Sequence, residues 1–273
     1  MTKTSRSLNR VVSSLLPPIV RQLLLRLGLG GSRFIYGFKS WDDARSNCRG
    51  YDSNQIADAL VEASRKVRDG EAAFERDGVV FERIEYSWPL LAAILGTATP
   101  RGSLRVLDFG GSLGTTYRQI RGVIEGLGID LNWVIVEQAH LVKIGNSEFK
   151  TEKLTFSGSL EGYRPGEFDL ILLASSICYV KEPMSVLSQI KALNPFAIAI
   201  DRTPISKDSS SQIGIQEVKN GSYEASYPIS VFAPGALEEA MEPEYKKVFD
   251  WECELQPDPQ TLSKGFFFVS TKS

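Results

Sequence analysis

The chain has 273 residues, of which 42% are hydrophobic and 23% are charged, and its formal net charge is −2. This is the composition of an ordinary globular protein, long enough for one large α/β domain with an appended segment. A net charge this small gives no overall attraction to nucleic acid, so we expect no nucleic-acid partner. The three cysteines, Cys48, Cys178 and Cys253, are odd in number and form no C-x-x-C pair, which argues against a zinc site or a disulfide framework and is typical of the reducing cytoplasm.

The N-terminal segment, residues 1–33, differs from the rest of the chain in its charge. It contains six basic residues and no acid, namely Lys3, Arg6, Arg10, Arg21, Arg26 and Arg33. Its apolar stretch, residues 19–29, is broken by two arginines and is too short and too charged to span a membrane. Two interpretations stay open: a helix docked on the main domain or on a partner chain, and a basic amphipathic element that rests peripherally on the inner membrane through residues 1–30.

Residues 34–100 predict a helical cap. An aromatic segment at 34–38 leads to Ser40, which is a suitable N-cap for a short helix beginning at Trp41. Helical spacing of apolar residues follows over 54–74, with an end near Gly70, and a further apolar helix is expected over 84–95.

From residue 101 to residue 273 strands and helices alternate. Apolar runs predict five strands, at 104–107, 133–136, 154–156, 168–174 and 196–200, and a C-terminal antiparallel hairpin at 245–251 and 265–270. Such continuous runs are typical of strands buried on both faces of a parallel sheet. We therefore expect an α/β, Rossmann-like fold with a seven-stranded, mostly parallel sheet and helices on both faces. The polar stretch 206–222 is interpreted as a loop, which either closes over the site or is a plain solvated connection.

A glycine-rich turn follows the first of these strands. Gly110, Gly111 and Gly114 carry no Cβ, so backbone N–H groups there can approach a ligand closely, and Tyr117 lies in the first turn of the helix that follows. Asp108 ends the strand. A loop that holds a pyrophosphate would avoid this fixed negative charge, whereas a cationic ligand such as S-adenosylmethionine fits it.

The later strands bring further polar groups to the same edge of the sheet. Glu137 ends the second strand, where a carboxylate accepts hydrogen bonds from ribose hydroxyls, and Gln138 follows it. Ser159 and Leu160 follow the third strand, where small and polar groups suit an adenine edge, and Ser175 follows the fourth. The predicted cofactor-binding residues are Asp108, Gly110, Gly111, Gly114, Tyr117, Glu137, Gln138, Ser159, Leu160 and Ser175.

These motifs carry a resemblance. Residues 106–114 resemble motif I of class I S-adenosylmethionine-dependent methyltransferases, and residues 133–137 and 168–180 resemble their second and fourth strands. More specifically, the chain resembles a group of predicted methyltransferases encoded among bacterial surface-polysaccharide (O-antigen type) genes. That likeness is carried by the stretches 40–44, 50–52, 108–111, 136–138, 201–204 and 227–228. The resemblance implies that Asp108 and Gly110 lie near the methionine part of the cofactor and that Glu137 binds its ribose.

Methyl transfer needs alignment of donor and acceptor and, for a hydroxyl acceptor, a base, but no metal ion. The candidate catalytic residues are Tyr179, Asp201, Arg202 and the single histidine, His140. Asp201 and Arg202 are expected at the end of the fifth strand, as groups that bind and deprotonate the acceptor or as a structural ion pair. The alternative for Tyr179 is an ordinary half-buried aromatic residue. His140 lies three residues past Glu137, and its alternatives are a cofactor contact and a surface residue.

Three functions are compatible with this pattern. The first is O-methylation of a sugar, glycan or related small-molecule hydroxyl, and the absence of the Asn/Asp-Pro-Pro-Tyr signature of amine methyltransferases argues against N-methylation. The second, an NAD-dependent oxidoreductase, is disfavoured because Gly110-x-Ser112-x-Gly114 does not fit G-x-G-x-x-G. The third is a non-catalytic cofactor-binding or scaffold protein with the same fold.

Overall fold

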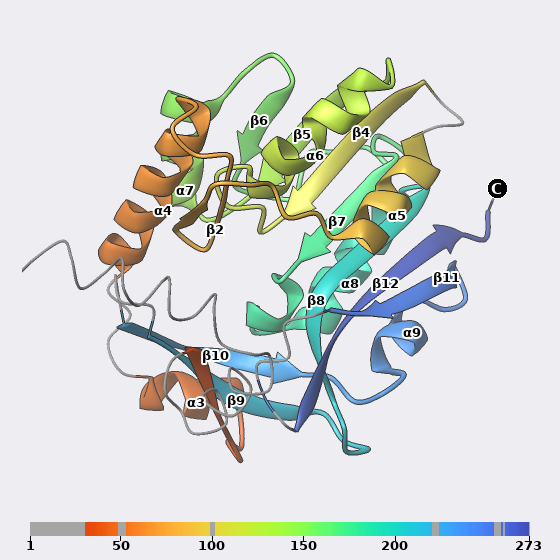
Figure 1. Ribbon diagram of the computed structural model, residues 1–273. Coiled ribbons are helices and arrows are strands. Elements are labelled where there is room, and N and C mark those ends of the chain that lie inside the picture. The colour runs from red at the N-terminus through yellow and green to blue at the C-terminus, as the bar shows by residue number, and fades with distance from the viewer. Residues whose placement is uncertain are drawn as a thin grey trace, which may run out of the picture.

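One seven-stranded sheet forms the centre of the molecule (Figure 1). The computed structural model describes residues 31–48, 53–98, 102–219, 224–253, 258 and 260–272; the basic segment 1–30, with its two interpretations, lies outside them. The strands of this sheet are β4 (Ser103–Phe109), β5 (Asp130–Val136), β6 (Leu154–Ser157), β7 (Leu170–Ala174), β8 (Ala197–Ser206), β11 (Tyr245–Glu252) and β12 (Thr261–Ser270). Their order is β11-β12-β8-β7-β4-β5-β6; β12 runs antiparallel to both of its neighbours, and all other neighbouring strands pair in parallel. The predicted fold class is confirmed.

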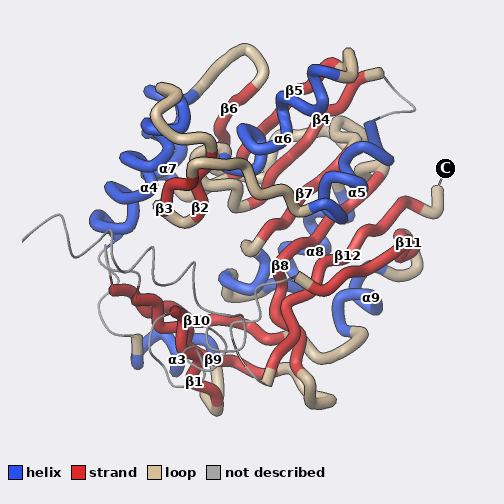
Figure 2. Tube along the Cα trace, viewed as in Figure 1, coloured by secondary structure: helices blue, strands red, loops and turns tan. Residues whose placement is uncertain are grey.

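Helices cover both faces of this sheet (Figure 2). They are α5 (Trp88–Ala98), α6 (Thr115–Gly126), α7 (Ala139–Ile144), α8 (Pro183–Ala192) and α9 (Ala236–Met241). Leu170 and Leu172 of β7 pack into one core with α5 and α6, whereas Ile171 and Leu173 pack into a second core with α8 and α9. Successive strand residues point to opposite faces, so a strand between two helical layers must be apolar throughout.

The segment before β4 contains the predicted helices and also strands that were not predicted. Its helices are α3 (Trp41–Asn47), α4 (Ser53–Arg68) and α5, which begins four residues later than expected. Ser40 caps α3 as predicted, because its hydroxyl accepts a hydrogen bond from the Asp43 N–H at 3.1 Å. Between α4 and α5 lies a hairpin of β2 (Phe74–Arg76) and β3 (Val79–Phe81). Asp77 and Gly78 form its turn with φ of 52° and 75°, the signs of a type I′ turn.

A second, three-stranded sheet contradicts the loop expected over 206–222. It consists of β1 (Gly31–Tyr36), β9 (Gln212–Lys219) and β10 (Glu224–Val231), in the order β1-β9-β10 and antiparallel throughout. The segment 212–219 is a strand because it has a partner on each side, so its backbone donors and acceptors are satisfied despite its polar side chains.

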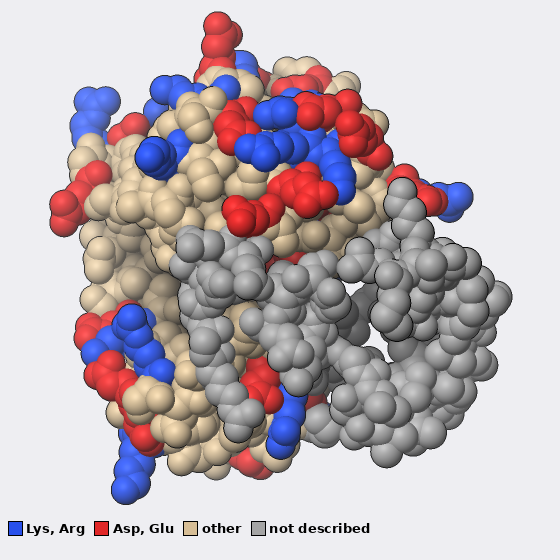
Figure 3. Space-filling view, turned by 90° about the vertical axis from the view of Figure 1, so that its left-hand side faces the viewer, with Lys and Arg blue, Asp and Glu red and all other residues tan. Residues whose placement is uncertain are grey.

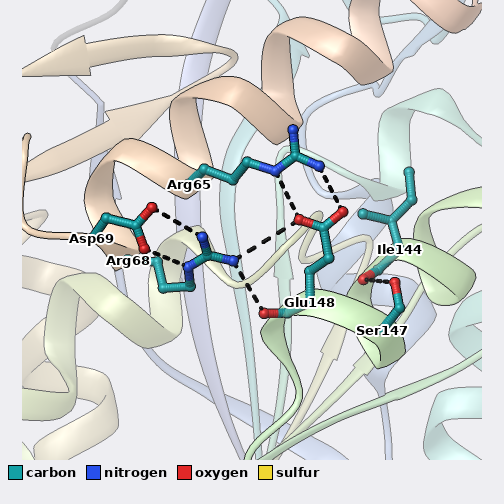
Figure 4. A network of polar contacts seen from close by, with 6 residues as sticks. All are labelled: Arg65, Arg68, Asp69, Ile144, Ser147 and Glu148. Carbon is teal, nitrogen blue, oxygen red and sulfur yellow. Dashed lines mark hydrogen bonds and ion pairs between the residues drawn. The ribbon is translucent and has the colours of Figure 1, made fainter.

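The helix α4 is fastened to the main domain by an arginine–glutamate pair (Figure 4). Arg65 donates two hydrogen bonds of 2.7 Å to the carboxylate of Glu148, which lies in the single turn of π-helix (Gly145–Phe149) that continues α7. Arg68 pairs with Asp69 and donates to the Glu148 carbonyl oxygen at 3.4 Å. On the face of the molecule that Figure 3 shows, described side chains of both charge signs are interspersed. None of the helices in the described part of the chain is both long and apolar enough to cross a membrane.

Trp251 of β11 lies directly against the backbone of β12. A Cβ added to Gly265 would lie 2.0 Å from Cε2 of the Trp251 indole, so no side chain fits there. The Trp251 Nε1–H also donates a 3.0 Å hydrogen bond to Asp201 in β8. The glycine therefore fixes the position of an indole that connects the C-terminal strands to the centre of the sheet.

We predict that Gly265→Ala lowers the free energy of unfolding by about 1–3 kcal/mol, because the added methyl group displaces Trp251 from its hydrogen bond. Urea denaturation followed by circular dichroism measures the change. Gly122→Ala is the control: this residue is exposed within α6 with open space around it, and alanine there is expected to stabilise the protein by about 0.5–1 kcal/mol. Equal effects of the two substitutions would contradict the steric argument.

Candidate functional site

The order of strands in the main sheet defines one switch point. The chain runs outward from β4 to β5 and β6, and then returns to place β7 on the other side of β4. The connections that follow β4 and β7 therefore separate toward opposite faces, and in open α/β sheets the ligand-binding crevice lies at this place, outside the carboxyl ends of the two strands. The glycine-rich turn follows β4, and Ser175 and Ser176 follow β7.

Close contacts explain the glycines in this turn. A Cβ on Gly111 would lie 2.4 Å from Oδ2 of Asp108, and a Cβ on Gly110 would lie 2.5 Å from the Ser176 Cβ. Gly110 and Gly114 also have φ of 74° and 98°, in the left-handed region that glycine adopts without strain. The loop thus folds tightly over the Asp108 carboxyl group and against the end of β7.

Asp108 is completely buried beneath this loop, with 0% of its surface exposed. Its Oδ2 accepts a 3.2 Å hydrogen bond from the Trp133 Nε1–H of β5, whereas its Oδ1 has no hydrogen-bond partner among the residues that the structure describes. Burial raises the pKa of Asp108 to about 7, and the nearby Glu137 charge adds to this effect, while the Trp133 hydrogen bond and Arg202 act in the opposite direction. A cation bound beside this carboxyl group would stabilise its ionised form.

Glu137 at the end of β5 holds the other side of the loop. One carboxylate oxygen accepts the Ser112 N–H at 3.2 Å, and the other accepts the Gln138 N–H at 2.8 Å. Burial raises the pKa of Glu137, which these hydrogen bonds and the charge of His140 partly offset. Because a carboxylate oxygen can accept more than one hydrogen bond, both oxygens keep the capacity to bind ligand hydroxyls.

Several buried polar atoms around the same turn have no hydrogen-bond partner within the described part of the chain. They are Oδ1 of Asp108 and the hydroxyl oxygens of Ser112 and Ser176. Buried polar atoms are normally hydrogen-bonded, so a cluster of exceptions in one place indicates a site that a bound molecule completes. These atoms and the tight glycine loop fit a polar, nucleoside-type ligand with a positive charge.

The other predicted cofactor residues lie at different depths around the crevice. Tyr117 is buried in α6, with its ring centre 5.9 Å from that of Trp133, so its side chain packs the core beneath the loop. Gln138 is exposed and contributes its backbone N–H to Glu137. After β6, Ser159 is exposed and its hydroxyl accepts the Glu161 N–H at 2.9 Å, whereas Leu160 packs against the second core.

Tyr179 lies after β7, where it connects the main sheet to the second sheet. Its hydroxyl donates a 2.7 Å hydrogen bond to the side-chain oxygen of Gln216 in β9, and its ring lies edge-on to Tyr227 of β10 at 5.2 Å. Burial raises the pKa of Tyr179 well above its usual value, so the hydroxyl stays protonated. His140 is exposed in the first turn of α7, beside Glu137, and is therefore on the β5 side of the crevice.

Asp201 and Arg202 are not at the end of the fifth strand as expected, because β8 continues to Ser206. The strand is longer because β12 pairs with it over its whole length. The Asp201 side chain is fully buried: one oxygen accepts the Trp251 Nε1–H at 3.0 Å, and the other accepts Arg202 Nη1–H at 2.9 Å. These contacts favour the structural ion pair. Arg202 also donates from Nε to the Ser175 hydroxyl at 2.8 Å, so it lies at the carboxyl end of β7.

Sequence reasoning missed the β2–β3 hairpin as part of this site. Glu75 is 1% exposed and accepts a hydrogen bond from the Thr115 hydroxyl at the start of α6. Burial raises the pKa of Tyr179 and lowers that of Arg76, and the charges of Asp77 and Arg202 respectively add to these effects, so the hairpin turn lies within electrostatic range of the ends of β7 and β8. The dipeptide Asp77-Gly78, which joins the segments 74–76 and 79–81, is a hairpin signal that could have found it.

Comparison with solved structures identifies the fold. A chain from the complex of the Haloferax volcanii Trm112 methyltransferase activator with a protein assigned as a methyltransferase matches with a TM-score of 0.50 and 11% identity, over 80% of this chain and 96% of that chain. The chain therefore has a Rossmann-like methyltransferase fold. Two further structures also match. The [4+2]-cyclase SpnF has a TM-score of 0.49 and 11% identity, over 80% of this chain and 94% of that chain. The N-terminal domain of EvdMO1, solved in the presence of SAH and D-fucose, has a TM-score of 0.48 and 15% identity, over 81% of this chain and 100% of that chain.

At the level of sequence, no family model and no curated protein matches the chain. Within the described residues, no three His, Cys, Asp or Glu side chains form a group that could hold a metal ion.

We predict that Asp201→Asn lowers the free energy of unfolding by about 1–3 kcal/mol, because it removes the charge that buried hydrogen bonds from Trp251 and Arg202 satisfy. Asp130→Asn is the control, since its pair with Lys153 is exposed and such pairs contribute little. Denaturant unfolding of both variants provides the comparison. An Asp201→Asn protein as stable as the wild type would contradict the structural role.

Proposed function

We propose that this chain is an S-adenosylmethionine-dependent methyltransferase whose cofactor-binding domain comprises residues 101–273. The observation that carries the proposal is the buried carboxyl group of Asp108 beneath a glycine loop, with an unpartnered oxygen and a pKa raised to about 7. A positively charged cofactor would satisfy this group, whereas a pyrophosphate would be repelled by it.

The residues around the loop fit the parts of such a cofactor. Glu137 has hydrogen-bonding capacity left for the two ribose hydroxyls, with Gln138 beside it. Gly110, Gly111 and Gly114 leave room for close approach of the ligand to the backbone. Ser159 and Leu160 lie beyond β6, in the direction in which an adenine would extend, and Ser175 lies on the opposite side. When bound, S-adenosylmethionine supplies an electrophilic methyl group with its leaving group already in place.

We further propose that the acceptor is the hydroxyl of a sugar, a glycan or a related small molecule. The motifs shared with the surface-polysaccharide group support this, as do the polar and aromatic side chains of Arg202, Tyr179 and Tyr227 beside the crevice. Asp201 is occupied by Trp251 and Arg202, so we do not assign it as the base. The Tyr179 hydroxyl donates its proton in a hydrogen bond to Gln216, and we propose that Tyr179 orients the acceptor. A non-catalytic scaffold is not favoured, because such a protein would not need the polar groups of Arg202 and Tyr179 beside the crevice.

The cofactor proposal predicts specific binding of S-adenosylhomocysteine in isothermal titration. Asp108→Ala and Glu137→Ala should each weaken this binding by about 1–3 kcal/mol, as expected for a lost charge-assisted hydrogen bond. Glu161→Ala is the matched control. Glu161 is exposed after β6, and its backbone N–H, which the substitution keeps, donates to Ser159, so this variant should bind S-adenosylhomocysteine like the wild type. Unchanged affinity in both site variants would show that the cofactor binds elsewhere. Formation of a methylated product from S-adenosylmethionine would distinguish an enzyme from a non-catalytic scaffold.

The raised pKa of Asp108 predicts that binding of the cofactor depends on pH. Below about pH 7 the free carboxyl group holds a proton, which must leave before the carboxylate can interact with a cation. The affinity for S-adenosylmethionine should therefore fall as the pH is lowered from about 8 to about 6, by at most about tenfold per pH unit for one coupled proton. The dependence should be weaker for S-adenosylhomocysteine, which lacks the sulfonium charge, and absent in Asp108→Asn. Identical profiles for both ligands would contradict this assignment.

A further inference from the structure

One residue of the glycine-rich turn, Ser112, carries a side chain although its backbone conformation suits glycine. Its φ is 53°, in the left-handed region, where a Cβ is crowded by the following carbonyl oxygen. Gly110 and Gly114 in the same turn also have positive φ, but they carry no Cβ and avoid this cost. The local backbone therefore does not explain why position 112 is a serine, and strain of this kind is most often found at functional sites.

The hydroxyl group of Ser112 is buried and has no hydrogen-bond partner among the described residues. A hydroxyl that is removed from water without a new partner costs free energy, so this side chain is unfavourable in the free protein for a second reason. Neither the conformation nor the contacts of Ser112 within the described chain account for its hydroxyl. A bound molecule that hydrogen-bonds to the hydroxyl would account for it.

The Ser112 hydroxyl lies beside the carboxylate of Glu137. The backbone N–H of Ser112 donates a 3.2 Å hydrogen bond to one carboxylate oxygen of Glu137. A serine hydroxyl oxygen is only three bonds from its own backbone nitrogen, at roughly 3–4 Å, so it lies within about 7 Å of that carboxylate oxygen. The two neighbouring hydroxyls of one ribose can bridge this distance with hydrogen bonds at both ends.

The two side chains have complementary hydrogen-bonding roles. A carboxylate only accepts, so a ribose hydroxyl that donates to Glu137 keeps the lone pairs of its own oxygen, which need a donor. The backbone N–H groups of Ser112 and Gln138 are already used by the two oxygens of Glu137. The Ser112 O–H, in contrast, is a donor without an acceptor within the described residues. Glu137 and Ser112 together therefore match both the donor and the acceptor of a ribose diol.

We propose that the Ser112 hydroxyl binds a ribose hydroxyl of the cofactor beside Glu137, and that Ser112 thereby selects a ribonucleoside over a deoxyribonucleoside ligand. The inference rests on the proposed function, because it takes the ribose to lie at Glu137. A site built to hydrogen-bond a hydroxyl discriminates against an analogue that lacks it, because its own polar groups then stay buried and unpaired. The left-handed conformation directs the Ser112 N–H to Glu137 and leaves the hydroxyl for the ligand.

The test measures binding of S-adenosylhomocysteine and of its 2′-deoxy and 3′-deoxy analogues to the full chain by titration calorimetry. The wild type should bind S-adenosylhomocysteine at least about tenfold more tightly than either analogue, since each has lost a hydroxyl. Ser112→Ala, which keeps the Cβ and loses only the hydroxyl, should bind S-adenosylhomocysteine about three- to tenfold more weakly. Its affinity for one of the two deoxy analogues should equal that of the wild type, because the partner of the serine is already missing there.

Ser112→Gly separates the role in binding from a role in the fold. This variant should lose the same affinity for S-adenosylhomocysteine as Ser112→Ala, but should unfold at the same temperature as the wild type or a higher one, because glycine adopts a φ of 53° without strain. Two matched controls should bind all three ligands like the wild type. Asn194→Gly relieves a positive φ of 46° at an exposed position, and Ser188→Ala removes an exposed hydroxyl that donates to the Met184 carbonyl oxygen.

The possible results distinguish this inference from the proposed function. If the wild-type chain binds no S-adenosylhomocysteine, the proposed function fails and the inference fails with it. If the wild type binds it but Ser112→Ala and Ser112→Gly bind it equally well, the role of Ser112 alone is wrong. Equal losses of affinity for S-adenosylhomocysteine and for both deoxy analogues would also overturn it, because the serine would then act away from the ribose. A loss that disappears with one deoxy analogue supports the inference and identifies the hydroxyl.

Discussion

A carboxyl group that is completely removed from water lies beneath the glycine loop, and the rest of the site is arranged around it. The Asp108 side chain receives one hydrogen bond, from the Trp133 indole of the neighbouring strand, and is covered by the backbone of Gly111. An isolated buried carboxylate is costly, which is why its pKa is raised. A glycine is required directly above it, because any side chain would overlap the carboxyl oxygens. The second acid, Glu137, fixes the loop from the other side through the Ser112 N–H.

The other half of the crevice is built from segments that are distant in the sequence. The hairpin β2–β3 is connected through Glu75 to the start of α6, and the preceding helix α4 is fastened to the main domain by Arg65 and Glu148. From the opposite side, Gln216 of the second sheet binds the Tyr179 hydroxyl. The main sheet thus provides the cofactor side of the crevice, and the additions to the common fold provide the other side. Since one fold supports many activities, these additions are where the specificity of this chain should reside.

The parallel centre of the main sheet was predictable from the sequence because its strands contain local apolar runs between turn residues, as in 168–174. Asp108 and Glu137 were found for the same reason, since a strand end followed by glycines is a local pattern. The second sheet was not predicted, because β9 is polar and is a strand only through partners on both sides. Asp201 was misplaced because the length of β8 is set by β12, which follows it much later.

The pairing of β1 with β9 has a consequence for how the chain acquires its structure during synthesis. The first described strand begins at Gly31, and the strand that pairs with it ends at Lys219. Until the ribosome has released that distant partner, the edge of β1 has no backbone hydrogen bonds from the second sheet, and exposed strand edges promote aggregation. Closing so long a loop is slow in general. The second sheet therefore cannot be completed until β9 and β10 have been synthesised, and a chaperone would protect the early strand during this interval.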